Sequence, residues 1–175
     1  MRRSDKIIAG SAALGLEEPV LASLALMFAA ATAPPAFVLV AFAGDEQVGF
    51  VAPGTIRVEG DSKRFETLWI YTPAQHVGPH LVRRAVRTSR ADCARGTVGE
   101  EQARFYGEGG HLLFAEPTRA PDMRPVLPRS ASEDVLRFVC AGEEPYPDIK
   151  VSPDVAAAAT LADEIAAFYR ANPTR

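Results

Sequence analysis

Two segments in the middle of the chain most constrain what it can fold into. The first, residues 65–90, reads FETLWIYTPAQHVGPHLVRRAVRTSR, and it predicts a strand, a turn at Pro73 and Gly78, and then a helix. The second, residues 99–114, reads GEEQARFYGEGGHLLF, and it predicts a short helix that ends at glycines before another strand. A strand end that faces a helix N-terminus binds anions, because the first N–H groups of a helix are free. The pair therefore predicts an anion site with a tyrosine beside it that can transfer a proton.

The predicted helix within the first segment is amphipathic. Its apolar face carries Leu81, Val82, Ala85 and Val86, and its basic face carries the arginines at positions 83, 84, 87 and 90. A solvated helix face accounts for such a basic stripe, although arginines in this arrangement also bind phosphate groups.

Composition sets the broad class of the protein. The chain has 175 residues, 47% of them hydrophobic and 23% charged, which suits one soluble domain with a hydrophobic core. The net charge of -3 argues against a nucleic-acid partner. Cys93 and Cys140 have neither metal-ligand nor redox spacing, so we expect two reduced thiols in a cytoplasmic protein.

One stretch needs comparison with membrane and export signals. Residues 20–43 contain no charge and are long enough to cross a bilayer, but Pro34 and Pro35 interrupt them. Acidic residues precede the apolar run, which fits a signal peptide poorly. The stretch is interpreted as a buried helix over residues 19–31 and a buried strand over residues 37–43, so no membrane partner is expected.

Local patterns predict the remaining elements. Residues 37–42 and 47–52 form a hairpin, and further strands follow at residues 55–59, 67–71 and 111–115. Residues 117–129 are rich in proline and predict a linker. Two helices close the chain, at residues 132–141 and 153–171. The fold class is therefore α/β with a mixed sheet, and the domain organisation is residues 1–116 followed by a linker and a two-helix extension over residues 117–175.

Four stretches carry a family resemblance, which covers roughly residues 20–116. Residues 44–50 are similar to a family hairpin, residues 68–73 to the strand and proline that follow it, and residues 75–80 to a cofactor-binding turn. Residues 100–111 are similar to a family helix that carries a Phe-Tyr pair. In these motifs the chain resembles the acyl-CoA N-acyltransferase (GNAT) superfamily.

The resemblance implies a fold, a function and a set of site residues. The fold is a GNAT-like mixed, mostly antiparallel sheet flanked by helices, with a C-terminal helical extension. The function is transfer of an acetyl group from acetyl-CoA to an amine of a small molecule or a protein. Tyr106 is the expected general acid that protonates the CoA thiolate, and Glu66 is the expected general base. The residues expected to bind acetyl-CoA are Ile70, Tyr71, Gln75, His76, Val77, Gly78 and His80.

Several alternatives stay open. Pro79 lacks an N–H and His80 is bulky, so the chain is alternatively a non-catalytic binding or assembly module of the same fold. Tyr106 is alternatively a packing residue, and Glu66 a strand glutamate with a cross-strand partner. A small dimeric barrel of the glyoxalase type, a homodimer, and a metal pair formed by two histidines are further alternatives.

Overall fold

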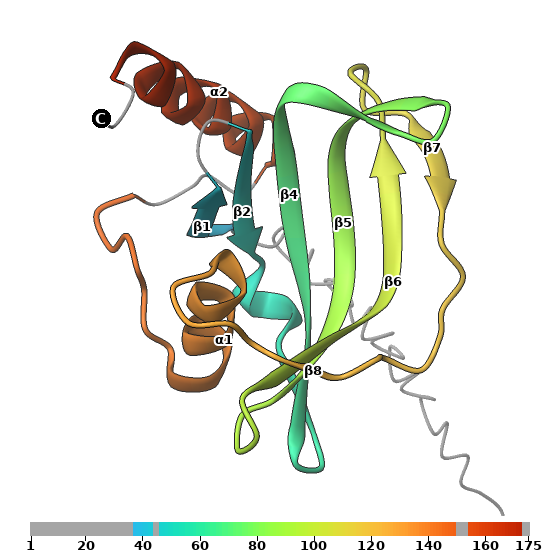
Figure 1. Ribbon diagram of the computed structural model, residues 1–175, viewed down its shortest axis with the longest axis vertical. Helices are drawn as coiled ribbons and strands as arrows, with labels where there is room; N and C mark the ends of the chain where they lie inside the picture. Colours follow the sequence, from blue (N-terminus) through green and yellow to red (C-terminus); the bar gives the residue numbers. More distant parts are fainter. Residues whose placement is uncertain (1–36, 44–45, 150–153, 173–175) are drawn as a thin grey trace, which may run out of the picture. The chain divides into compact units, whose positions relative to one another are not determined.

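The computed structural model describes residues 37–43, 46–149 and 154–172. Within these residues, eight strands form one sheet and two α-helices pack against it (Figure 1). The strands are β1 (Val38–Ala43), β2 (Gln47–Val51), β3 (Arg57–Glu59), β4 (Ser62–Val77), β5 (His80–Asp92), β6 (Thr97–Tyr106), β7 (Leu112–Ala115) and β8 (Arg124–Pro125). A short 3-10 turn, η1 (Pro53–Thr55), precedes β3, and the helices are α1 (Ala131–Ala141) and α2 (Val155–Ala171).

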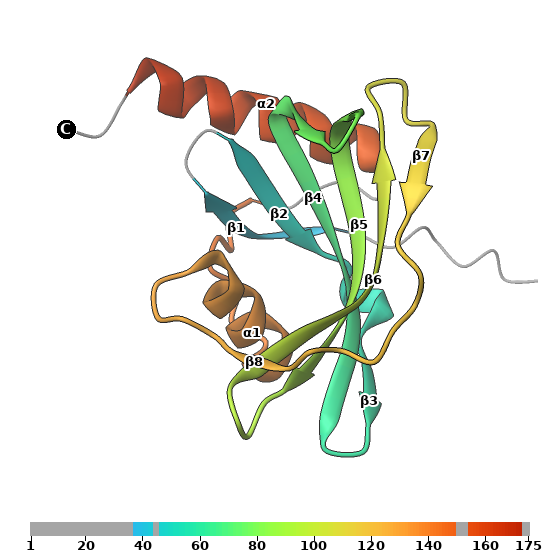
Figure 2. The ribbon, with the colours of Figure 1, turned by 45° about the vertical axis from the view of Figure 1, so that its right-hand side comes forward.

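The sheet is antiparallel and strongly curled. Its main path runs β1-β2-β4-β5-β6-β7, with β3 beside β4 and β8 beside β6, and every one of these pairings is antiparallel. The long strands β4 and β5 twist across the centre, so that the sheet curls into a half-barrel (Figures 1 and 2). The fold is mixed α/β as predicted, but the sheet that the structure describes contains no parallel pair.

The helix predicted after Gly78 is a strand. Gly78 has a φ of 58° in the tight turn between β4 and β5, a conformation that glycine adopts readily. The prediction was wrong because the apolar residues of β5 occur in adjacent pairs, Leu81 with Val82 and Ala85 with Val86, rather than in strict alternation. Spacing of this kind imitates the 3.6-residue period of a helix.

The short helix predicted within residues 99–106 is also wrong. These residues belong to β6, where buried and half-buried positions alternate. The buried positions include Gly99 and Glu101 as well as Ala103 and Phe105. Because glycine and glutamate are not apolar, the period of two is hidden in the sequence.

The two helices lie over opposite faces of the sheet. Ala158 and Ala162 of α2 pack against Leu68 and Ile70, while α1 packs against Phe65. Successive strand residues point to opposite faces, so Phe65 and Leu68 belong to different faces. The predicted C-terminal helices are confirmed, and the alanines let α2 approach the sheet closely. The division of the chain after residue 116 stays a prediction.

Caps define where each helix begins. The Ser130 hydroxyl accepts a hydrogen bond from the Glu133 N–H at 3.3 Å, and the Asp154 carboxylate accepts one from the Ala157 N–H at 2.6 Å. These contacts satisfy N–H groups that a helix leaves free at its first turn.

A disulfide joins Cys93, just after β5, to Cys140 in the last turn of α1. The expectation of two reduced thiols is therefore wrong. Cysteines 47 positions apart carry no local pairing signal, and only the packing of α1 against the sheet brings them together.

The hairpin predicted from residues 37–42 and 47–52 is confirmed as β1 and β2. The helix predicted at residues 19–31 lies outside the described residues. Among the helices that the structure describes, none is both long and apolar enough to cross a membrane.

Candidate functional site

The predicted cofactor turn is the tip of a β-hairpin. Gln75, His76 and Val77 of β4 pair with Val82, Leu81 and His80 of β5. The backbone here forms a ladder between two strands, and the helix whose free N–H groups would bind a pyrophosphate is not present at this position. The ring of His80 packs against Phe114 with centroids 5.0 Å apart.

Ile70 and Tyr71, also predicted to bind the cofactor, point to opposite faces of the sheet. The side chain of Ile70 is fully buried in the cluster beneath α2. Tyr71 lies in the cluster on the other face, and its hydroxyl accepts a hydrogen bond from Nη2 of Arg87 at 3.1 Å. The two side chains therefore do not line one common site.

The structure does not bring the predicted acid and base together. Glu66 lies opposite Thr88, and Tyr106 lies opposite Arg84, which precedes Thr88 by four residues in β5. At about 3.3 Å per residue, the two positions are separated by roughly 13 Å along the strand. Glu66 instead accepts a hydrogen bond from Arg104 at 2.9 Å, and Tyr106 lies 4.8 Å beneath the Arg84 guanidinium. Their individual catalytic roles stay predictions.

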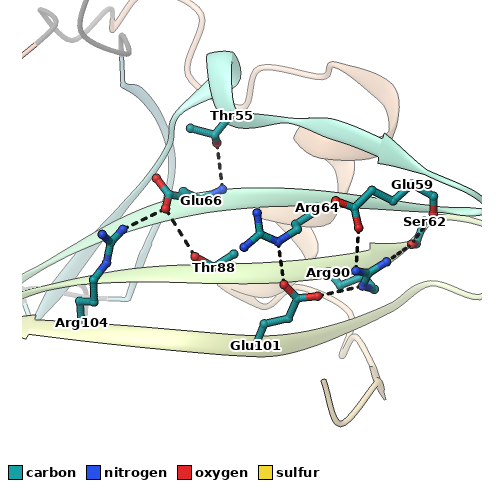
Figure 3. Close-up of polar contacts among 9 residues, drawn as sticks. All are labelled: Thr55, Glu59, Ser62, Arg64, Glu66, Thr88, Arg90, Glu101 and Arg104. Carbon is teal, nitrogen blue, oxygen red and sulfur yellow. Dashed lines mark hydrogen bonds and ion pairs between the residues drawn. The ribbon is translucent and has the colours of Figure 1, made fainter. Parts of the chain in front are cut away.

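Glu66 lies on a face of the sheet that carries two separate groups of hydrogen-bonded charged side chains, and we call this face the charged face (Figure 3). It comprises Glu59, Ser62, Arg64, Glu66, Thr88, Arg90, Glu101 and Arg104, contributed by β3, β4, β5 and β6. Most of its charged side chains are between 30% and 43% exposed, so this face is open to solvent.

Glu101 is the buried centre of the charged face. Its side chain is only 8% exposed, and its two carboxylate oxygens accept hydrogen bonds from Arg64 at 2.8 Å and Arg90 at 2.9 Å. Burial alone would raise the pKa of Glu101, but the hydrogen bonds and charges of the two arginines outweigh burial and hold this pKa below its usual value. Arg90 also donates to Glu59 at 2.7 Å, so the guanidinium is held by two carboxylates.

A cavity of about 360 Å³ lies on the opposite face of the sheet, and we call it the Arg87 pocket. Thr67 and Trp69 of β4 and Arg87 and Ser89 of β5 line it, together with residues of α1 and of the segment that contains β8. Arg87 forms an ion pair with Glu100 at 3.1 Å.

The residues of the Arg87 pocket were not predicted as a site from the sequence. The alternation of Thr67, Trp69 and Tyr71 within a predicted strand was the available signal, since it places the three side chains on one face. The position of Arg87 on that face could not be found, because β5 was predicted to be a helix.

Comparison with known proteins assigns the family. The family model described as "Surface-adhesin protein E" matches residues 37–141, from the start of the sheet to the end of α1. The chain belongs to the surface-adhesin protein E family. The match includes both cysteines of the disulfide and the complete charged face.

Solved structures of Haemophilus influenzae protein E are among the similar chains. Its crystal form II is 13% identical, with a TM-score of 0.47, covering 62% of this chain and 88% of that chain. Another structure of the protein is 16% identical, with a TM-score of 0.47, covering 62% and 85%. Protein E from non-typeable Haemophilus influenzae is 14% identical, with a TM-score of 0.44, covering 73% and 88%. No curated protein matches the chain.

Membership of the surface-adhesin protein E family overturns the GNAT assignment and what it implied. The expected acetyltransferase activity and the use of acetyl-CoA are wrong, and so is the GNAT-like description of the fold. The shared motifs are short strand–turn patterns, which unrelated folds also contain. The alternative of a non-catalytic binding module agrees better with the family, although its fold is not that of GNAT proteins.

The cytoplasmic location is also wrong. The family is one of surface adhesins, and the cysteines are joined in a disulfide. Disulfides of this kind form and persist outside the reducing cytoplasm. Within the described residues, no group of three histidine, cysteine or acidic side chains is arranged to hold a metal ion.

Proposed function

We propose that this protein is a non-enzymatic adhesin of the bacterial outer surface that attaches to host molecules. The match of residues 37–141 to the surface-adhesin protein E family carries the proposal. The disulfide between the sheet and α1 supports it, because a protein exposed outside the cell gains stability from such a cross-link.

The charged face is the proposed contact surface. It lies beside the part of the sheet that α2 covers, and its side chains reach solvent while ion pairs hold them in place. Side chains that are already ordered lose less conformational entropy on binding than free ones do. Charges of both signs in fixed positions favour a partner with a complementary charge pattern.

The predicted division of the chain gives the two parts different roles in this proposal. Residues up to 116 supply the strands that present the charged face, and residues 117–175 supply the helices that cover the core. The family match extends beyond this division to the end of α1, which is cross-linked to the end of β5. A homodimer stays a prediction.

Adhesion is tested with beads that carry the full-length protein and a monolayer of cultured host epithelial cells. Wild-type beads are expected to bind severalfold more than albumin-coated beads, with attachment weakened by added salt. Equal binding of the two kinds of bead would contradict the adhesin function.

The contact surface is tested with paired substitutions. Glu66→Gln combined with Arg104→Gln removes one ion pair of the charged face while keeping the side-chain volumes similar. Glu164→Gln combined with Arg170→Gln makes the same chemical changes on exposed positions of α2 and serves as the control. We expect the first pair to reduce bead attachment and the control pair to leave it unchanged. Equal attachment of the two variants would rule out this part of the charged face.

A further inference from the structure

We propose that the Arg87 pocket binds a carboxylate group attached to a small apolar body, either a free organic acid or the C-terminus of a peptide. This inference concerns the face of the sheet opposite the charged face and does not rest on the adhesin function.

Two buried hydroxyl groups in the pocket have unused hydrogen-bonding capacity. Ser89 is 7% exposed and lines the cavity, and its hydroxyl has no partner among the described residues. Thr67 is 4% exposed, and its oxygen accepts a hydrogen bond from the Trp69 indole N–H at 3.1 Å. No acceptor within the described part of the chain takes the hydroxyl proton of Thr67. Among the described residues, Nε of Arg87 is the fully buried side-chain atom that lacks a hydrogen-bond partner, and it lies in the same pocket. Because buried polar atoms are usually satisfied, the pocket is a candidate ligand site, and the two hydroxyls offer it further donors.

Arg87 supplies the positive charge. Thr67 lies directly opposite Arg87 in the ladder, and Ser89 follows two residues later on the same face. The guanidinium has five N–H donors. One donates to Tyr71, one pairs with Glu100, and the buried Nε has no partner in the described part of the chain. The side chain is 36% exposed, so a ligand within the pocket reaches the remaining N–H groups of its two Nη atoms.

These three side chains point to a carboxylate. The proton of Thr67, the hydroxyl of Ser89 and the guanidinium of Arg87 are all able to donate hydrogen bonds. A carboxylate accepts hydrogen bonds and donates none, and its charge strengthens each bond. A neutral amide of the same size fits less well, because its NH₂ group would face these donors.

One wall of the pocket favours an apolar body. Phe65, Trp69 and Val135 pack together there. The carboxylates that also line the pocket, Glu100 and Asp122, are each paired with an arginine. The Trp69 ring packs against Gly49, where an added Cβ would lie only 2.6 Å from a ring atom. A cavity of about 360 Å³ suits a small ligand rather than a large cofactor.

Trp69 is the only tryptophan of the chain, and it reports on the pocket by its fluorescence. We would titrate the full-length protein with hexanoate and with hexanamide, which differ only in the charged group. A second pair, acetyl-Ala-Leu with a free or an amidated C-terminus, tests a peptide source. A preference of about tenfold or more for the carboxylate in either pair is expected. The pair that shows the preference identifies the source, and equal affinity or no binding in both pairs would overturn the proposal.

Two variants locate the binding. Ser89→Ala removes a hydroxyl that has no protein partner, so we expect unchanged folding and about tenfold weaker binding of the preferred carboxylate. Arg87→Lys is expected to weaken binding, while Arg84→Lys, on the opposite face of the same strand, leaves it unchanged. Full affinity in both Ser89→Ala and Arg87→Lys would place the ligand elsewhere and refute the proposed site. A failure of the bead assay leaves these titrations unaffected, so the two proposals fail separately.

Discussion

Removal of the disulfide is the sharpest test of how the sheet and α1 depend on one another. Cys93 lies just after β5 and Cys140 lies in the last turn of α1, so the cross-link ties the end of the longest hairpin to the helix that covers one face of the core. Cys93→Ser combined with Cys140→Ser removes the cross-link and changes each side chain by a single atom.

The expected loss follows from the length of the closed loop. The two cysteines are 47 positions apart, and closing a loop of this length restricts the unfolded chain by about 4 kcal/mol. For a folded unit of this size, such a loss lowers the melting temperature by roughly 10 °C. The effect acts on the unfolded state, so the fold and the contacts of α1 are expected to remain.

Thermal unfolding, followed by circular dichroism with and without a reducing agent, measures this effect. Reduced wild-type protein is expected to have the same melting temperature as the double variant. The melting temperature of the double variant itself is expected to be unchanged by the reducing agent. Titration of the native protein with a thiol reagent is expected to find no free thiol. Two free thiols in the oxidised native protein, or a melting temperature that reduction does not change, would refute the reasoning.

Three further predictions concern the charged face, the core and the cap of α2. Because the pKa of Glu101 is lowered on folding, its stabilising contribution is present above about pH 4.3 and lost as the pH falls through the folded-state pKa. The difference in urea midpoint between wild type and Glu101→Gln is therefore expected to shrink on acidification, whereas a constant difference would exclude this linkage. Gly49→Ala is expected to cost about 1–3 kcal/mol and to shift the fluorescence of Trp69, because the new Cβ meets the ring. Gly54→Ala, where nothing lies within 4 Å, is its control, and similar losses in both variants would argue against the contact. Asp154→Ala is expected to cost about 1 kcal/mol by removing the cap of α2, and an unchanged urea midpoint would show that the cap does not contribute.

Much of the secondary structure is predictable because its signals are local. The turn between β1 and β2 separates two apolar runs, and a polar residue stands immediately before each C-terminal helix. Neighbours in the chain generate these signals, so they do not depend on the tertiary structure. The strand around Trp69 was found for the same reason, although β4 is longer than the predicted strand.

The site was not predictable because its signals depend on long-range pairing. Arg87 meets Thr67 and Tyr71 only once β5 pairs with β4, and the sequence of β5 imitates a helix. The same error placed Gln75 to His80 at a helix N-terminus, where the GNAT resemblance implied that acetyl-CoA binds. The burial of Glu101 was not predictable either. A glutamate is rarely buried unless it is paired, and its two arginine partners come from other strands.

The sequence by itself determined the hairpin, the caps and the two C-terminal helices, because each depends on residues close together in the chain. Tertiary structure alone decided that residues 80–92 and 97–106 form strands, which face of the sheet each arginine occupies, and that Cys93 meets Cys140. The physical reason is that an antiparallel sheet gains its stability from partners on other strands and helices. The hydrophobic pattern of a single strand therefore does not predict which strands and helices it pairs with.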